Sequence, residues 1–352
     1  MNMNECDEEW DNFCDGIETD RPTIDVGLSL HENNKGIPKS TNIYISTKTK
    51  IAYLNKNIDL KECFWKINVM PYSTAREGVI KKQMKFIFVD EAELSTVQER
   101  LSKEEMFDEQ IISHIRNVDG KIPFKDIRKI SVGVCKKDIT SYRCKQKSAF
   151  YNCFVIIIRL LVNGVFKESH VKIFNTGKLE LPGIQTEEGL DSCLRTIVAI
   201  LNTECGLDIA LTERPCETVL INSNFSCGYY IDRDKLSDIL KYKYHLHTSY
   251  DPCSYPGIMS KFYYYDDKQI QDGIKDADGK DMSEMSFMIF RTGSVLIVGK
   301  CTENVLLVIY EFLKTLLTTE YNTICQPNIV LEDKSHVVKQ KKVRKRLVNV
   351  QI

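Results

Sequence analysis

This sequence of 352 residues lacks several features that define large protein classes. No apolar run approaches the roughly 20 residues that a membrane-spanning helix needs. The first twenty residues contain acidic but no basic side chains, which is unlike the basic and apolar start of a signal peptide. We therefore expect a soluble, intracellular protein in a reducing compartment.

The residue patterns of common catalytic and metal sites are also missing. None of the 13 cysteines forms a Cys-x-x-Cys pair, and buried reduced thiols explain them most simply. The six histidines show no catalytic pairing, and there is no phosphate-binding loop, nucleophile elbow or paired-carboxylate motif. His245, His247 and Cys253 are the only hint of a metal site. The sequence therefore predicts a protein that is not an enzyme and has no metal or cofactor.

A long internal repeat is the main feature that the sequence does contain. The segment from Phe174 to Gly183, FNTGKLELPG, is matched 116 residues later by FRTGSVLIVG, from Phe290 to Gly299. The same offset relates Thr186 to Thr302 at the start of two helical patterns. Two long copies predict two related halves of one pseudo-symmetric domain, not a solenoid.

Charge and periodicity divide the chain into four parts. We expect an acidic disordered tail (1–38), a first repeat (39–210), a second repeat (211–322) and a basic tail (323–352). The basic tail could contact phosphates, serve as a nuclear-import signal or simply be solvated. Residues 91–147 have no counterpart in the second half. We predict that they form an insertion with a helix near 93–117.

The predicted elements give an α+β fold. The first repeat should contain a strand from residue 42, a helix at 58–69, a strand at 78–90, a hairpin turning at Asn163-Gly164, a strand at 178–184 and a helix from Thr186 to about 202. The second should contain strands at 218–227, 255–266, 286–291 and 294–299, and helices at 232–242 and from Thr302. The sequence leaves open whether 78–90 or 150–161 forms the second strand of the first repeat.

Two such repeats side by side resemble the core of the TATA-box-binding protein family. Ser249 to Lys261, SYDPCSYPGIMSK, is similar to that family's SYEP-x-x-FPGLI-x-R. The segments from Ile173 and Ile289 are similar to its two IF-x-SGK strands. The insertions and the Asn-, Lys- and Tyr-rich composition look most like the versions in large DNA viruses. The resemblance implies a pseudo-two-fold saddle of two β-α-β(n)-α repeats, with helices on the convex face and a curved antiparallel sheet that leaves the other face for a ligand.

The resemblance also implies a way of binding DNA. This family is itself a standard example of minor-groove binders that wedge apolar side chains between base steps, with a kink of about 80°. By motif position, Phe174, Phe290 and Tyr255 occupy three wedge positions, although each could instead be a core residue. The fourth position falls near Arg76 or Glu77, where no aromatic stands. Phe150 and Phe154 are substitutes only if the strand register differs.

Further positions of the saddle carry over residue by residue. Asn42 and Asn222 match the paired asparagines that read base edges at its centre, because an amide both donates and accepts. They could instead be turn or strand-edge residues. Lys82 and Lys261 fall where basic residues meet phosphates. On the underside, Leu296 and Val298 take positions of the family's Val and Thr. The first half instead has Glu180 and Pro182, and a carboxylate there would oppose phosphates by roughly 1 kcal/mol.

The resemblance thus predicts a TATA-binding-like general transcription initiation factor. Its partners would be double-stranded promoter DNA that is rich in A·T pairs, a factor IIB-like protein and DNA-directed RNA polymerase. If viral, it would act in the cytoplasmic virus factory or the nucleus of the host, or be packaged in the virion. A saddle that serves as a protein-interaction platform with weak or no DNA binding is the alternative. A repair glycosylase with an accessory saddle is a third possibility, but too little chain lies outside the repeats for a catalytic domain.

Overall fold

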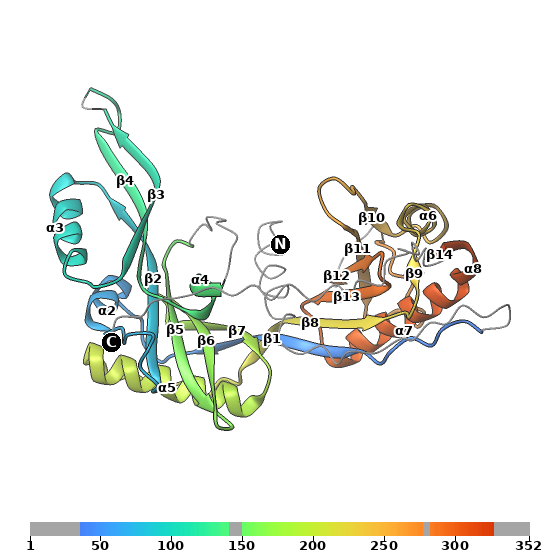
Figure 1. Cartoon of the computed structure of the whole chain (residues 1–352), viewed down its shortest axis with the longest axis horizontal. Coiled ribbons are helices and arrows are strands. Elements are labelled where there is room, and N and C mark those ends of the chain that lie inside the picture. The colour runs from blue at the N-terminus through green and yellow to red at the C-terminus, as the bar shows by residue number, and fades with distance from the viewer. Residues whose placement is uncertain (1–35, 118, 141–149, 277–281, 327–352) are drawn as a thin grey trace, which may run out of the picture. The chain divides into compact units, whose positions relative to one another are not determined.

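The computed structural model describes residues 36–117, 119–140, 150–276 and 282–326 (Figure 1). The predicted acidic tail lies almost wholly outside the described residues, as do most of the basic tail and part of the polar loop that precedes residue 282. The helices and strands within these described residues lie between Tyr44 and Gln326. No helix within the described residues is long and apolar enough to cross a membrane.

The first half of the fold runs from β1 to α5 and contributes seven of the twelve strands of the large sheet. Its elements are β1 (Tyr44–Tyr53), α2 (Leu60–Lys66), β2 (Gly78–Phe88), α3 (Glu91–Leu101), β3 (Phe107–Arg116), β4 (Phe124–Gly133), α4 (Lys136–Thr140), β5 (Cys153–Val162), β6 (Val165–Phe174), β7 (Lys178–Ile184) and α5 (Glu187–Cys205). The Asn163-Gly164 hairpin is confirmed, because both residues adopt the positive φ angles that a type I′ turn requires, 52° and 77°.

The second half runs from β8 to β14. Its elements are β8 (Glu217–Ser226), β9 (Tyr230–Ile231), α6 (Arg233–Asp238), the π-helical turn η1 (Ile239–Lys243), β10 (His247–Ser249), β11 (Gly257–Tyr265), β12 (Met282–Phe290), β13 (Ser294–Gly299), α7 (Glu303–Thr319), α8 (Tyr321–Ile324) and β14 (Cys325–Gln326). The predicted helix at 232–242 is thus split between α6 and η1.

Twelve strands form one sheet in the order β10-β11-β12-β13-β8-β1-β7-β6-β5-β2-β4-β3, and every pair is antiparallel. β1 and β8 lie side by side in the interior of this order. Beyond β8 the last three long strands of the second half follow in reverse chain order, and β7, β6 and β5 do the same beyond β1. The large antiparallel sheet with helices confirms the predicted α+β class.

Four helices, α2, α5, α6 and α7, begin close to where the sequence predicts. Asp59, Thr186, Asp232 and Thr302 are the N-caps of α2, α5, α6 and α7, and each side chain accepts a backbone N–H three residues later. Asp232 follows Asp59 by 173 residues, but Thr302 follows Thr186 by only 116. The first half therefore carries 57 extra residues between its two capped helices.

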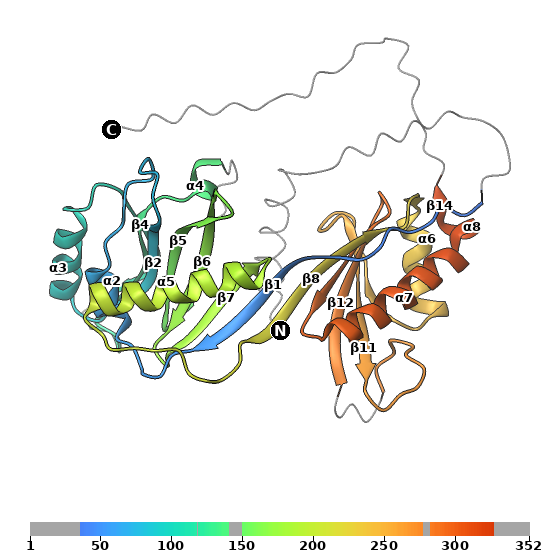
Figure 2. The same ribbon diagram turned by 90° about the horizontal axis from the view of Figure 1, so that it is seen from below.

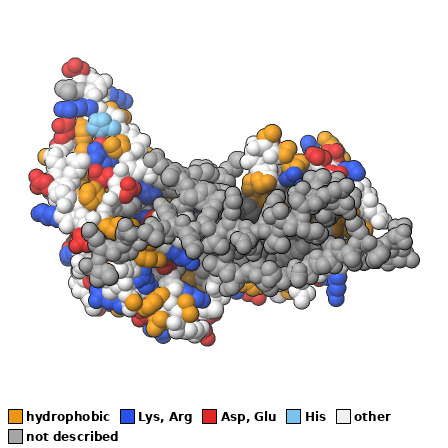
Figure 3. Space-filling view, viewed as in Figure 1, with side chains coloured by type: hydrophobic (Ala, Val, Ile, Leu, Met, Phe, Trp, Pro, Cys, Tyr) orange, Lys and Arg blue, Asp and Glu red, His pale blue; other side chains and the backbone are white. Residues whose placement is uncertain are grey.

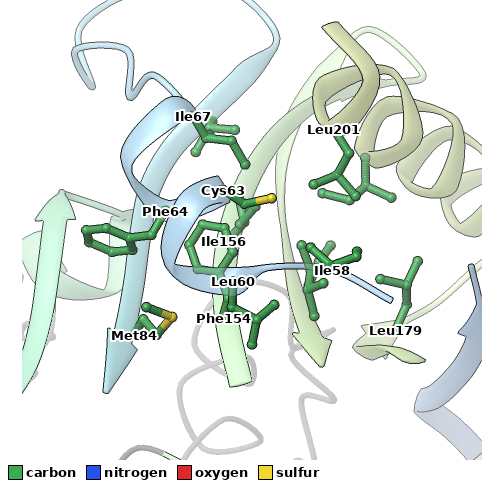
Figure 4. Close-up of a cluster of buried hydrophobic side chains, with 14 of the residues drawn as sticks. Ile58, Leu60, Cys63, Phe64, Ile67, Met84, Phe154, Ile156, Leu179 and Leu201 are labelled. Atoms are coloured by element: carbon green, nitrogen blue, oxygen red, sulfur yellow. The ribbon is translucent and has the colours of Figure 1, made fainter. Parts of the chain in front are cut away.

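Two hydrophobic cores hold these helices against the sheet. One joins α2, α3 and α5 to the first-half strands, and Figure 4 shows its centre, where Phe64 of α2 and Ile67, which follows this helix, lie in one cluster with Phe154 and Ile156 of β5. The other joins α6, α7 and α8 to the second-half strands. The helices α5 and α7 lie on the same face of the sheet (Figure 2). We call this the helical face, and the other side the opposite face.

Two lysines of β1, Lys48 and Lys50, form ion pairs with the two long helices, α7 and α5. Lys48 Nζ lies 2.7 Å from the Glu303 carboxylate, and Lys50 Nζ lies 3.0 Å from that of Glu187. These glutamates are the first residues of α7 and α5, where an acidic side chain also interacts favourably with the helix dipole. The hydrogen bond from Lys48 holds the pKa of Glu303 below its usual value. β1 thereby fixes the starts of both helices.

The strand register resolves the alternative that the sequence left open. β6 pairs with β5, and β2 lies beyond β5. The strand at 153–162 therefore takes the place beside β6 that β11 takes beside β12. Lys82 of β2 therefore does not take the place in the first half that Lys261 of β11 takes in the second. In sheet order, β2 occupies the place of β10.

The insertion is a structural unit of its own. It connects β2 to β5 through α3, β3, β4 and α4, whereas only seven residues, 250–256, connect β10 to β11. The predicted helix at 93–117 is correct for α3 but wrong for β3. Ile111, Ile112 and Ile115 are β-branched residues that favour a strand once they can pair with β4, which restricts the helix to the charged residues before Ser102.

Candidate nucleic-acid interface

The opposite face of the second half presents apolar side chains along neighbouring strands. In β13, Val295 and Ile297 enter the core, so the intervening Leu296 and Val298 lie on the opposite face. Met288 of β12 is directly opposite Leu296 in the ladder. Both are less than a tenth exposed, and Val298 is half-buried. This apolar stripe ends at Phe290.

Two aromatic rings lie together at the end of the stripe. The centroids of Tyr255 and Phe290 are 6.1 Å apart, with the ring planes at 60°. Gly257 pairs with Phe290, and a Cβ at this glycine would lie 3.0 Å from ring carbons of both aromatics. The loop before it is held by the Asp251 carboxylate, which accepts hydrogen bonds from the Cys253 N–H and the Ser254 hydroxyl. The structure thus brings together two of the predicted wedge residues.

The centre of the sheet is formed by β1 and β8. Thr47 pairs with Asn222 and Thr49 with Leu220, on either side of the Lys48–Ile221 pair. The Asn222 amide donates to the Thr47 hydroxyl over 3.3 Å. Asn42, the other predicted base-reading asparagine, precedes β1 and is exposed, so Thr47 and not Asn42 lies opposite Asn222. Sequence spacing missed Thr47 because hydroxyl residues are common in strands and give no signal of their own.

The first half carries its aromatic side chains at the equivalent place in the ladder. Cys153 pairs with Phe174, as Gly257 pairs with Phe290. Tyr151 therefore stands two residues before the paired position, as Tyr255 does. Tyr151 and the adjacent Phe150 are 55% and 42% exposed. The register thus favours these two residues for the fourth wedge position, in place of the segment near Arg76.

The first-half aromatics are surrounded by lysines. Lys178 lies 5.1 Å from the ring centre of Phe174, Lys172 lies 5.2 Å from Phe150 and Lys85 lies 3.6 Å from Tyr151. Phe154, the other substitute, is fully buried in the core.

Arg76 and Glu77 lie at the wrong end of the strands for a wedge beside Phe174. Gly78 pairs with Arg159, and the Glu77 carboxylate accepts the Leu161 N–H over 2.7 Å. Cys153 at the other end of β5 is the residue that pairs with Phe174. Arg76 and Glu77 are therefore separated from Phe174 by most of the length of β5. The fourth wedge position that the motif predicted near Arg76 or Glu77 is not beside Phe174.

The two predicted phosphate-contacting lysines have different environments. Lys82 is only 2% exposed, and its ammonium donates to the Ile67 carbonyl on the helical side, over the ring of Phe64. Burial lowers the pKa of Lys82. A buried ammonium cannot meet a DNA phosphate, so Lys82 does not join the interface. Core residues alternate along β11, so the side chain of Lys261 lies on the opposite face. Its ammonium lies 2.6 Å from the Glu284 carboxylate.

The carboxylate of Glu180 is neutralised within the sheet. Lys172 of β6 pairs with Glu180 of β7 in the ladder, and their charged atoms are 2.7 Å apart. The opposing charge reduces the expected repulsion between Glu180 and phosphates. Pro182 lies two residues further along β7, on the same face.

The short helix α4 packs on the opposite face of the first half (Figure 1). Cys135 at its start clusters with Ile80 and Ile157, which is an opposite-face residue of β5. Lys81 of β2 forms an ion pair of 2.7 Å with Asp138. The backbone N–H of Lys136 donates to the Glu168 carboxylate over 3.0 Å. The insertion therefore covers part of the opposite face in the first half. In the described second half, the same face is apolar and carries no helix.

His170 of β6 lies beside α4 on this face. It is opposite Ile157 in the ladder. Charged side chains lie near its ring and influence its pKa: Lys81, Lys137, Lys172 and Asp138. Burial, reinforced by Lys137 and Lys81, lowers the pKa of His170 to about 4. At neutral pH the imidazole is therefore uncharged.

The chain is similar to known proteins in sequence and in fold. No family model matches the chain. A TATA-box-binding protein-like protein of Acanthamoeba polyphaga mimivirus is 25% identical over 207 residues, which cover 53% of this chain. The resemblance to the TATA-box-binding protein family is thereby confirmed. The chain spans 54% of that viral relative.

A solved TATA-binding-like structure, TBP of Methanococcus jannaschii, is also similar to this chain. The match covers 80% of this chain and 99% of that one, with a TM-score of 0.38 and 16% identity. No group of three or more potential metal ligands is present among the described residues.

Proposed function

We propose that the protein is a TATA-binding-like transcription initiation factor that binds A·T-rich duplex DNA in the minor groove through the opposite face. The Tyr255–Phe290 pair at the end of the apolar stripe carries this proposal. Two half-exposed rings at one end of a sheet can enter a base step, while the half-buried Val298 contacts the floor of the groove and Leu296 supports it from beneath. Such a surface favours A·T pairs, because these lack the protruding amino group of guanine.

The two halves would act together as a pseudo-two-fold saddle. Asn222 and Thr47 would face the central base pairs, since an amide and a hydroxyl can both donate and accept. Phe174 with Tyr151 or Phe150 would supply the second kink, and Lys261 would meet phosphates. The helical face, with α5 and α7, would recruit a factor IIB-like protein and RNA polymerase. In this proposal the protein has no catalytic role, and its viral relative favours a site of action in an infected cell.

Equilibrium binding to matched A·T-rich and G·C-rich duplexes tests this proposal directly. Binding should be tighter for the A·T-rich duplex and should weaken as salt is raised, because phosphate contacts release counterions. Equal affinity for both duplexes would contradict minor-groove reading. A folded protein that binds neither duplex at low salt would overturn the proposal.

The covered first half supports a second candidate function. α4 and its ion pair with Lys81 occupy part of the opposite face, and the net charge of −1 gives little attraction for DNA. A saddle that serves as a protein-interaction platform would show these features. Retained binding to a factor IIB-like protein, combined with no DNA binding at low salt, would establish this candidate.

A further inference from the structure

The outer edge of the first half is the 10-residue strand β3. It is the last strand in the sheet order, so within the described residues only one side of its backbone pairs with a strand, β4. Long edge strands offer hydrogen-bonding groups to another chain, and proteins usually protect them with lysine, proline, bulges or a covering segment. β3 contains no lysine or proline, and its protection is a bulge between Ile111 and Ser113.

Large apolar side chains are exposed along this edge. Phe107, Ile111 and Ile112 are 46%, 58% and 38% exposed, and Ile115 is 37% exposed. Figure 3 shows hydrophobic side chains interspersed with charges of both signs over the β3–β4 hairpin. Such a row on a sheet edge is typical of a site where a further strand adds to the sheet.

The sequence of β3 is complementary to itself in reverse. When Phe107–Arg116 is paired antiparallel with a second copy, Glu109 faces His114 and Phe107 faces Arg116. Ile111 of one copy faces Ile112 of the other at the centre, where the two bulges meet, and no like charges are opposed. Directly opposed apolar pairs and pairs of opposite charge stabilise an antiparallel pairing of strands. The edge therefore matches a second copy of this chain.

Glu109 adds an independent observation. One of its oxygens, Oε2, accepts from Arg128 over 3.3 Å, whereas Oε1 is buried and has no hydrogen-bond partner within the described structure. A buried acceptor without a partner is costly. His114 uses Nδ1 for the Asp126 carboxylate, at 2.7 Å, so its other ring nitrogen could donate across the edge. After a small rotation of the carboxylate, His114 of a second copy would supply the missing donor.

We propose that the protein forms a two-fold symmetric dimer by antiparallel pairing of β3 with β3 of a second copy. In a two-fold interface each contact occurs twice, so Glu109 of each copy would face His114 of the other. The pairing would extend the sheet beyond the insertion and satisfy both strand edges. This proposal does not depend on DNA binding, because β3 lies at the far end of the sheet order from the Tyr255–Phe290 pair.

Sedimentation of the full-length protein against concentration tests the dimer. Wild type should approach twice the chain mass of 40.6 kDa. The double variant Ile111→Lys/Ile112→Lys should sediment as a monomer with an unchanged circular-dichroism spectrum, because lysines then face each other at the centre. Ile270→Lys is the matched control: Ile270 is 82% exposed in the loop after β11, so this variant should remain dimeric.

Opposite charges test the register. Ile111→Lys/Ile112→Glu places lysine opposite glutamate at both central positions, so it should dimerise in low salt and dissociate as salt is raised. An equimolar mixture of the double-lysine variant with Ile111→Glu/Ile112→Glu should form a mixed dimer. A wild type that stays monomeric at every concentration would overturn the proposal. So would a double-lysine variant that dimerises like wild type, since the contact would then lie elsewhere.

Discussion

The opposite face differs between the two halves of the sheet. In the second half, Met288, Leu296 and Val298 lead to the Tyr255–Phe290 pair. In the first half, the same face carries α4 and two ion pairs, Lys81–Asp138 and Lys172–Glu180. The helix α4 and its ion pair originate in the connection that leads into β5, whereas the Lys172–Glu180 pair comes from residues of β6 and β7 themselves. A duplicated ligand surface can thus be altered in one copy by an insertion, while the strands that support it keep their order.

The largest expected effect comes from removing the second-half aromatic pair. Tyr255→Ala/Phe290→Ala should weaken binding to an A·T-rich duplex by about a hundredfold, because the unstacked base step loses its support. Tyr151→Ala/Phe174→Ala is the matched first-half variant and should weaken binding by about tenfold. Fluorescence anisotropy measures both constants. Equal losses would show that the insertion leaves the two halves equivalent in function.

Releasing α4 should make the halves more alike. Asp138→Ala removes the acceptor of Lys81 and of the Cys135 N–H, so we expect a loss of about 1 kcal/mol in the free energy of unfolding. The freed lysine and uncovered face should strengthen binding to an A·T-rich duplex roughly threefold to tenfold. Asp276→Ala, which breaks an ion pair with Lys268 in the β11–β12 loop, is the control. Unchanged affinity in Asp138→Ala would mean that α4 lies outside the footprint.

Acid should weaken the first half through His170. Its pKa is lowered in the folded protein to about 4, so the unfolded chain binds the proton more tightly. The stabilising contribution is complete above about pH 6.5, the usual value for histidine, and is lost progressively as the pH falls toward 4. Thermal unfolding between pH 7 and pH 5 should therefore show a smaller decrease in Tm for His170→Gln than for wild type. Parallel pH profiles would rule out this role.

The smallest expected effect concerns Glu180. Glu180→Gln removes one carboxylate from the opposite face and releases Lys172, so DNA affinity should rise by less than about tenfold. The gain should shrink as salt is raised. Glu311→Gln on α7 also breaks a lysine pair but lies on a helix, and it should leave affinity unchanged. An equal gain in both variants would indicate a general charge effect.

Local signals in the sequence predicted most of the elements. The Asn163-Gly164 turn and the caps at Asp59, Thr186 and Thr302 all occur where expected, because turns and caps depend on neighbouring residues. Phe290 and Tyr255, two of the residues that the motifs singled out, lie close together in the structure.

Long-range register was the part that the sequence could not predict. Whether β2 or β5 lies beside β6 depends on how the insertion folds, and both segments are equally good strands. The wrong register placed the fourth wedge near Arg76 and matched Lys82 to Lys261. Thr47 was not predicted at the centre for a similar reason, since the bulges in β1 shift the ladder without any local signal.

Bending of DNA is the most direct test of the central claim that aromatic side chains of the opposite face enter the minor groove. Energy transfer between dyes at the two ends of an A·T-rich duplex measures the bend at saturating protein. Wild type should increase the energy transfer. The Tyr255→Ala/Phe290→Ala variant, also at saturating concentration, should give only a small part of this increase. A duplex that binds wild type tightly but stays straight would contradict the wedge mechanism.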